Sequence, residues 1–317
     1  MDERAVVAHR ARAAFVWLSR ADNGAAVDEV RAAYSCASRL MRHCGDTIGE
    51  CVVQLVHDVS IGSVSESTTT ADRLVAMTST AASPAQRARL IRSASLAFRL
   101  ANEPDRALTV LETAYELCER HRLPQSAIAT LSLAGAVAIE EARLEIANSQ
   151  LRRLDQWTID PRDAISLLDG LLLRSRVELL TGRFSRGVAE LQSYDWSTID
   201  TTTPRSRALL LSTRVHLARV QNDDAALRSF GQRLHLVLRD AWRTPCADYT
   251  VGAAAFAEAS LRGVESATSL VSEFLRSVRR QLGPARSLLG AFIRESAPHL
   301  LEQPIEEGKT LHRRQAR

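Results

Sequence analysis

A helical pattern with a period of about 40 residues constrains this chain more than any other feature. In each repeat a small residue opens a second helix, and an apolar residue follows four positions later. The small residues are Ala107, Ala147, Gly187, Ala226 and Ala267. The steps between them are 40, 40, 39 and 41 residues. Self-similarity at a spacing of about 20–50 residues is typical of chains that stack helical hairpins side by side.

The pattern predicts an all-α fold, an α-solenoid of stacked antiparallel hairpins with about seven hairpins plus a capping helix. An apolar residue also precedes each small residue by sixteen positions. These residues are Ile91, Leu131, Leu171, Leu210 and Val251. Prolines recur at the expected joints between hairpins, where they end one helix and permit the next to begin at a new angle. No segment shows sustained two-residue alternation with β-branched residues, so we expect essentially no sheet.

The chain divides into three parts. Residues 1–82 predict irregular helical hairpins with a Ser/Thr-rich loop at 60–70, which is small, polar and poor in helix formers. For residues 83–303 the sequence predicts the regular array and its C-terminal cap. For residues 304–317 it predicts a polar tail. The predicted helices of the first part are 4–20, 25–42, 46–59 and 71–80. The predicted hairpins are 85–121, 125–157, 163–196, 204–240 and 246–281, followed by a last helix at 285–301.

The first regular repeat has the small and apolar residues of a tetratricopeptide (TPR) motif. They are Ile91, Ala94, Ser95, Phe98, Ala107, Leu111 and Ala114. Over residues 85–281 the chain resembles the TPR superfamily, and its longer period resembles the helical-repeat region of MalT-type bacterial regulators. Some positions depart from the pattern, namely Arg174, Glu178, Thr213, Arg214 and Glu258. Either these repeats are degenerate or the register slips by one residue there.

The resemblance implies a concave groove lined by the first helix of each hairpin. The candidate partner-binding residues on that groove are Arg89, Arg92, Arg99, Asp169, Arg176, Tyr249 and Phe256. Three arginines on one helix suit a carboxylate or an acidic segment. Tyr249 and Phe256 would add an apolar anchor. The alternative is that the arginines only solvate an exposed face.

No pattern of catalytic or metal-binding residues stands out, so we expect no enzyme, no metal and no cofactor. The chain has no Gly-x-Ser-x-Gly elbow and no Gly-rich phosphate loop. Neighbouring carboxylates at Glu140-Glu141 and Glu306-Glu307 diverge on a helix and indicate solvated charge. A group of Cys and His residues lacks the tight Cys pair typical of zinc sites and indicates structural thiols. Its members are Cys36, His43, Cys44, Cys51 and His57.

Charge and composition limit the classes of partner that we expect for this chain. The net charge is only +4, and aromatic residues do not interleave the arginine-rich C-terminal region, so nucleic acid is not the expected partner. No apolar run reaches the roughly 18 residues of a membrane span. Five cysteines without framework spacing favour reduced thiols and a cytoplasmic location. The arginine-bearing N-terminus would also suit a mitochondrial presequence in a eukaryotic host.

The expected function is a non-catalytic scaffold or adaptor that binds a protein or peptide, acidic in character, in the concave groove. The alternative is the effector-sensing helical-repeat region of a bacterial transcriptional regulator without its DNA-binding part. The sequence indicates neither the partner's identity nor the oligomeric state.

Overall fold

The computed structural model describes residues 27–43, 45–61, 64–80, 83–160, 163–194, 204–241, 247–278 and 288–301. Over these residues every regular element is a helix, as the sequence predicts. The predicted helix at 4–20 and the predicted tail at 304–317 lie outside them. Among the described residues, no helix has both the length and the apolar content needed to cross a membrane.

The first group of helices is α2 (Val27–His43), α3 (Thr47–Ile61), α4 (Val64–Met77), α5 (Pro84–Leu100), α6 (Pro104–Arg120), α7 (Pro124–Glu140) and α8 (Leu144–Leu154). The second group is α9 (Ala164–Leu180), α10 (Arg186–Ser193), α11 (Pro204–Val220), α12 (Asp224–Ala241), α13 (Ala247–Arg262), α14 (Val264–Val278) and α15 (Leu288–Ser296). Two short 3₁₀ turns, η1 (Thr78–Thr80) and η3 (Pro298–Leu301), follow α4 and α15.

One turn recurs along the regular part of the chain and explains its period. The same three-residue link follows each of α5, α6, α7, α9 and α11, which are all 17 residues long. After α9, two further residues separate this link from α10. The middle residue of each link is left-handed, with φ between 51° and 67°: Asn102, Arg122, Ala142, Gly182 and Asn222. The third link residue donates back to a carbonyl of the finished helix, as from Glu103 to Phe98 at 2.8 Å. This is the Schellman arrangement, and helix plus link repeat every 20 residues, so a hairpin repeats every 40.

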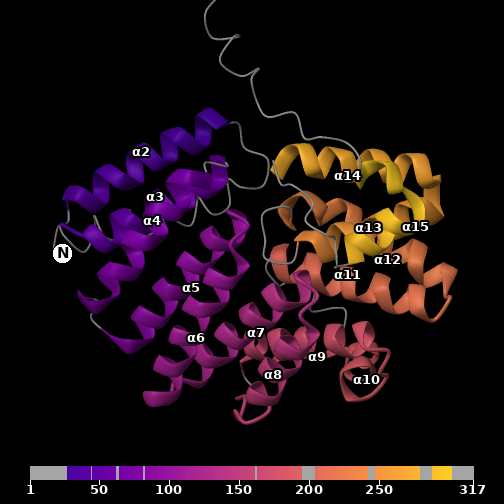
Figure 1. Ribbon diagram of the computed structural model, residues 1–317, viewed down its shortest axis with the longest axis horizontal. Coiled ribbons are helices and arrows are strands. Elements are labelled where there is room, and N and C mark those ends of the chain that lie inside the picture. Colours follow the sequence, from indigo (N-terminus) through magenta and orange to yellow (C-terminus); the bar gives the residue numbers. More distant parts are fainter. Residues whose placement is uncertain are drawn as a thin grey trace, which may run out of the picture.

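The contacts between neighbouring helices are compatible with an array of hairpins. The pairs α5–α6, α7–α8, α9–α10, α11–α12 and α13–α14 are in contact, and so are the alternate helices from α5 through α13. In Figure 1 the array forms an arc, with α2–α6 in one arm, α11–α15 in the other, and α7–α10 between them. Gly187 shows why small residues recur at the crossings, because an added Cβ would lie 2.9 Å from the backbone nitrogen of Ser175.

The first helix of each hairpin lies inside the array and the second lies outside. The inner helix α7 buries 13 of its 17 residues, whereas the outer helix α6 buries five of 17. The inner helix α13 likewise buries ten of its 16 residues. A helix that is apolar on all sides is packed on all sides. The inner face of the arc is therefore filled over much of its length, and only part of it is open.

The predicted loop at 60–70 is wrong, because most of it belongs to helix α4. Ser67 is buried, and its neighbours Ala71 and Leu74 are completely enclosed. The polar side chains also have partners, since the Thr70 hydroxyl donates to the Asp58 carboxylate at 3.0 Å. Packing on α3 and α5 thus overrides the weak helix propensity of the Ser/Thr run.

The predicted capping helix exists as α15, but it does not extend the stack. Its principal helix contact is α13, the inner helix of the last hairpin. The N-terminal residues Leu288 and Leu289 and the following Phe292 and Ile293 are buried there. The helix therefore covers the inner face of the array at one end.

Candidate functional site

A pocket of about 340 Å³ opens on the inner face where α5, α7, α9 and α11 lie next to one another. We call it the arginine pocket. Its lining residues are Arg89, Arg92, Ser93, Leu96, Ala129, Ser132, Leu133, Ala136, Ile165, Asp169, Leu172, Arg176, Ser206 and Leu209. Most of these residues repeat at steps of 40, as Arg92, Ser132 and Leu172 do. Equivalent positions of successive repeats thus form one continuous wall.

Two arginines of α5 give the pocket its positive charge. Arg89 is exposed, and its guanidinium forms no hydrogen bond or ion pair with the described residues. Arg92 is partly buried and donates to the Ser126 carbonyl at 2.8 Å and to the Thr130 hydroxyl at 3.4 Å. Burial lowers the pKa of Arg92, and the charge of Arg89 acts in the same direction. A bound anion would relieve both effects.

The floor of the pocket contains a third arginine and an unpartnered hydroxyl. Arg176 of α9 is only 2% exposed, and its Nε donates to the Leu172 carbonyl at 2.9 Å. Ser132 of α7 is 8% exposed, and its hydroxyl has no hydrogen-bond partner among the described residues. A buried polar group without a partner is costly, which favours a ligand that completes its hydrogen bonding. Asp169 is the single carboxylate in the lining.

The structure therefore brings together four of the predicted groove residues and separates the others. Arg89, Arg92, Asp169 and Arg176 line the arginine pocket. Arg99, in contrast, is 3% exposed and lies inside the protein. Its guanidinium nitrogen Nη2 is 3.8 Å from a carboxylate oxygen of Glu140. The prediction that Arg99 lines an open groove is wrong, because α7 covers this part of α5.

Tyr249 is also enclosed, so the predicted aromatic anchor is wrong at this position. Its hydroxyl lies 2.8 Å from Nδ1 of His216, and its backbone N–H donates to Glu140 at 3.1 Å. The guanidinium of Arg176 lies 5.8 Å from the centre of its ring. Because the arc curves strongly, the end of α7 meets the start of α13, although the two residues are 109 apart in sequence. The inner face closes at this point.

Phe256 is covered by α15. Its ring meets the ring of Phe292 edge to face, with the centres 5.3 Å apart. On the other side, the guanidinium of Arg219 lies 3.8 Å from the centre of the Phe256 ring. Phe256 thus has the apolar contacts expected of an anchor, but they are made within the chain.

The sequence interpretation missed Glu140 and His216. Glu140 was expected to be solvated, yet it is 5% exposed and joins α5, α7 and α13. A signal was present in the repeat, because the residues one repeat before Glu140 and one and two repeats after it are apolar: Leu100, Leu180 and Val220. A lone carboxylate at an apolar repeat position indicates a buried partner.

A larger cavity of about 880 Å³ lies beside the arginine pocket and shares Ile165 and Ser206 with it. Trp157 and Tyr194 line this cavity together with residues of α9 and α10. Its best-buried cation, Arg174, pairs with Asp155 and lies 3.5 Å from Glu190. The charge of Arg174 is therefore balanced within the protein.

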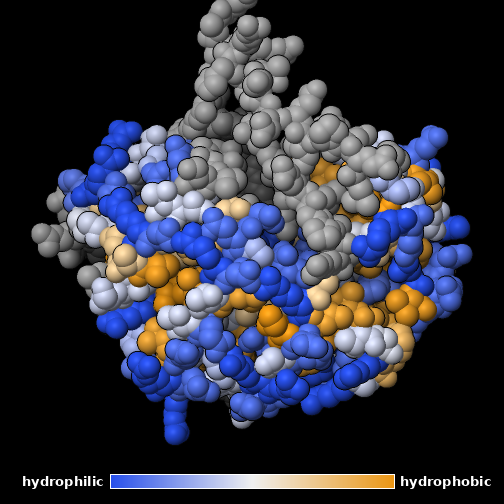
Figure 2. Space-filling view, in the orientation of Figure 1, coloured by the Kyte–Doolittle hydropathy of each residue, from blue (hydrophilic) through white to orange (hydrophobic). Residues whose placement is uncertain are grey.

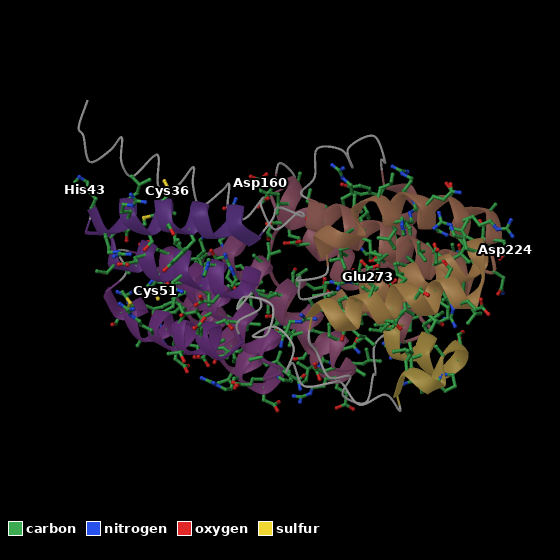
Figure 3. The ribbon with its side chains drawn as sticks, turned by 90° about the horizontal axis from the view of Figure 1, so that it is seen from above. Cys36, His43, Cys51, Asp160, Asp224 and Glu273 are labelled. Carbon is green, nitrogen blue, oxygen red and sulfur yellow. The ribbon has the colours of Figure 1, made fainter. Side chains whose placement is uncertain are left out.

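The described members of the cysteine and histidine group do not come together around one point. Figure 3 shows Cys36 and His43 at different places along α2, and Cys51 on α3. The Cys51 thiol is buried and faces the Thr70 carbonyl at 3.6 Å, and burial raises its pKa. No three Cys, His, Asp or Glu side chains of the described ranges are arranged to hold a metal ion. Cys44 lies outside those ranges.

On the face of the molecule that Figure 2 shows, small groups of hydrophobic residues lie among hydrophilic ones.

Comparisons with family models, with curated proteins and with solved structures found no match for this chain.

Proposed function

We propose that this chain is a non-catalytic binding module, a TPR-like solenoid whose inner face takes an acidic segment of a protein or peptide in the arginine pocket. The observation that supports this most directly is the charge of the lining. The lining contains three arginines, Arg89, Arg92 and Arg176, and a single carboxylate, that of Asp169. Arginine presents a planar fork of donors that matches a carboxylate, and it does so best where water is partly excluded.

The lining also argues for binding rather than catalysis. Arginine keeps its proton at neutral pH, so the three arginines are poor general acids or bases. Asp169 has no second carboxylate, histidine or cysteine beside it in the lining with which to share proton transfer. The proposal therefore includes no reaction and no cofactor. A reducing compartment such as the cytoplasm suits the free thiols of Cys36, Cys51 and Cys118.

The test is a selection of random peptides on the full chain, followed by measurement of affinity by fluorescence anisotropy. We expect the selected peptides to be rich in Asp and Glu, and their affinity to fall as salt is raised. Arg89→Glu should weaken binding about tenfold or more, because it reverses a charge at the pocket. Arg228→Glu is the matched control, since Arg228 is exposed on the outer helix α12. Equal loss in both variants would contradict the proposal.

A second candidate, the sensing of a small anionic effector, is favoured by the size of the pocket. A volume of about 340 Å³ lies at the low end of the range for small-molecule sites, about 300–1,000 Å³. Small dicarboxylic acids should then raise the midpoint of thermal unfolding, and Arg89→Glu should remove that shift. A shift without any affinity for acidic peptides would favour this candidate over the first.

A further inference from the structure

Helix α15 occupies, on α13, the repeat positions that line the arginine pocket on other helices. Gly252 and Phe256 follow Arg92 and Leu96 by 160 residues, which is four repeats of 40. A Cβ added to Gly252 would lie 2.2 Å from the backbone nitrogen of Leu289, so the two helices touch through their backbones. The inner face of the array thus already binds one helix, and that helix belongs to the chain itself.

Helix α15 docks through a pattern of apolar residues followed by a carboxylate. Two pairs of apolar residues face α13 and are at most 3% exposed: Leu288, Leu289, Phe292 and Ile293. The carboxylate of Glu295 follows and contacts Nη2 of Arg219 with its two oxygens, at 2.8 and 3.1 Å. Arg219 belongs to the neighbouring inner helix α11 and follows Arg99 by 120 residues, or three repeats. The helix is therefore held by apolar anchors one turn apart and by an acid on an inner-face arginine.

The arginine pocket offers the same elements on α5, α7 and α9. Leu96, Leu133 and Leu172 provide apolar surface, and Arg89, Arg92 and Arg176 provide the cations. No helix of the described residues lies across these positions. The pocket differs from the α15 site most clearly at the repeat position of Gly252, where Arg92 and Ser132 stand instead. A helix would therefore lie farther from the backbone here and meet more positive charge.

We propose that the arginine pocket accepts an amphipathic α-helix of a partner protein, docked as α15 is docked on α13. Its apolar residues are spaced one turn apart, and its carboxylates face Arg89, Arg92 and the Ser132 hydroxyl. Recognition of an amphipathic helix by an apolar groove commonly uses anchors at i and i+4. This inference rests on the proposed function and specifies the conformation of the partner.

The chain supplies its own probe for the test. A fluorescent, end-capped peptide of residues 286–300 contains the anchors and Glu295. We expect it to bind the full chain, and its Arg294→Glu variant to bind about tenfold more tightly because the pocket is positively charged. Ala291→Pro in that tighter peptide should weaken binding by at least about tenfold, because proline interrupts the helix between the anchors. Anisotropy gives all three affinities, and circular dichroism of the protein variants checks their folding.

Variants of the protein locate the bound peptide. Arg89→Glu should weaken binding about tenfold, whereas Arg219→Gln and Arg228→Glu should leave it unchanged. If Arg219→Gln weakens binding and Arg89→Glu does not, the peptide exchanges with α15 and the inference is wrong. If the proline peptide binds as tightly as its parent and still depends on Arg89, the partner is not helical, but the proposed acidic-segment function stands. Absence of binding by every peptide of this series would also overturn the inference.

Discussion

The inner face has an open half and a closed half that are built from the same repeat. On α5, α7 and α9 the equivalent positions include Arg92, Ser132 and Leu172, and they line a pocket. On α13 the corresponding residue is Gly252, and α15 lies against it. The same backbone repeat therefore either binds a helix of its own chain or leaves a site open. At this repeat position, glycine permits a close helix contact, and larger side chains line the open pocket.

The two halves are joined through the Glu140 carboxylate, and removal of this group should have the largest effect. Glu140→Ala removes the carboxylate that lies 3.8 Å from the buried Arg99 guanidinium and accepts a hydrogen bond from the Tyr249 N–H. We expect a loss of about 3–5 kcal/mol in the free energy of unfolding, measured by urea denaturation. Glu145→Ala on the outer helix α8 is the control and should cost less than about 0.5 kcal/mol. Similar losses for both variants would show that the contacts of Glu140 do not connect the two halves.

The closed half should also respond to pH through His216. Burial, together with the charge of Arg219, lowers the pKa of His216 from 6.5 to about 4. Between these two pH values the unfolded chain binds a proton that the folded chain does not. Above pH 6.5 the neutral His216 should therefore not reduce the free energy of unfolding. As the pH falls toward 4, the free energy of unfolding should decrease by up to roughly 3 kcal/mol.

His216→Gln isolates this contribution. Carboxylates also titrate at the acidic end of this range, so the informative quantity is the difference between the pH profiles of wild type and variant. That difference should follow a single ionisation that is lost as the pH falls from 6.5 to 4. Parallel profiles would mean that His216 is not held in its neutral form by burial.

A direct comparison of the halves uses Gly252 and Ser132, which are 120 residues apart and occupy the same repeat position. Gly252→Ala places a Cβ against the backbone of α15 and should destabilise the protein by about 1–3 kcal/mol. Ser132→Ala removes a buried hydroxyl without a partner and should be neutral or stabilise by up to about 1 kcal/mol. Thermal unfolding of the two variants measures both effects. Equal destabilisation would remove the distinction between an open and a closed half.

The sequence predicts the helices far better than it predicts the course of the inner face. Helix starts such as Pro104 and turns such as Asn222 are local, so residue preferences are enough to locate them. The burial of Tyr249 depends instead on a contact with Glu140, more than 100 residues away. Such a contact follows from the accumulated curvature of the array, which no short pattern contains. For this reason the sequence identified Arg89 and Arg92 but misplaced Arg99 and Tyr249.

The smallest expected effects concern the turn that both halves share. Arg122 adopts a left-handed conformation that disfavours a side chain, so Arg122→Gly should stabilise the protein by about 0.5–1 kcal/mol. Gly182→Ala should destabilise it by about 1 kcal/mol through the backbone alone, since an added Cβ at Gly182 meets no atom within 4 Å. Urea denaturation would detect both changes. If the signs hold, the turn is interchangeable along the array, and the difference between the halves arises from inner-face side chains rather than from the links between helices.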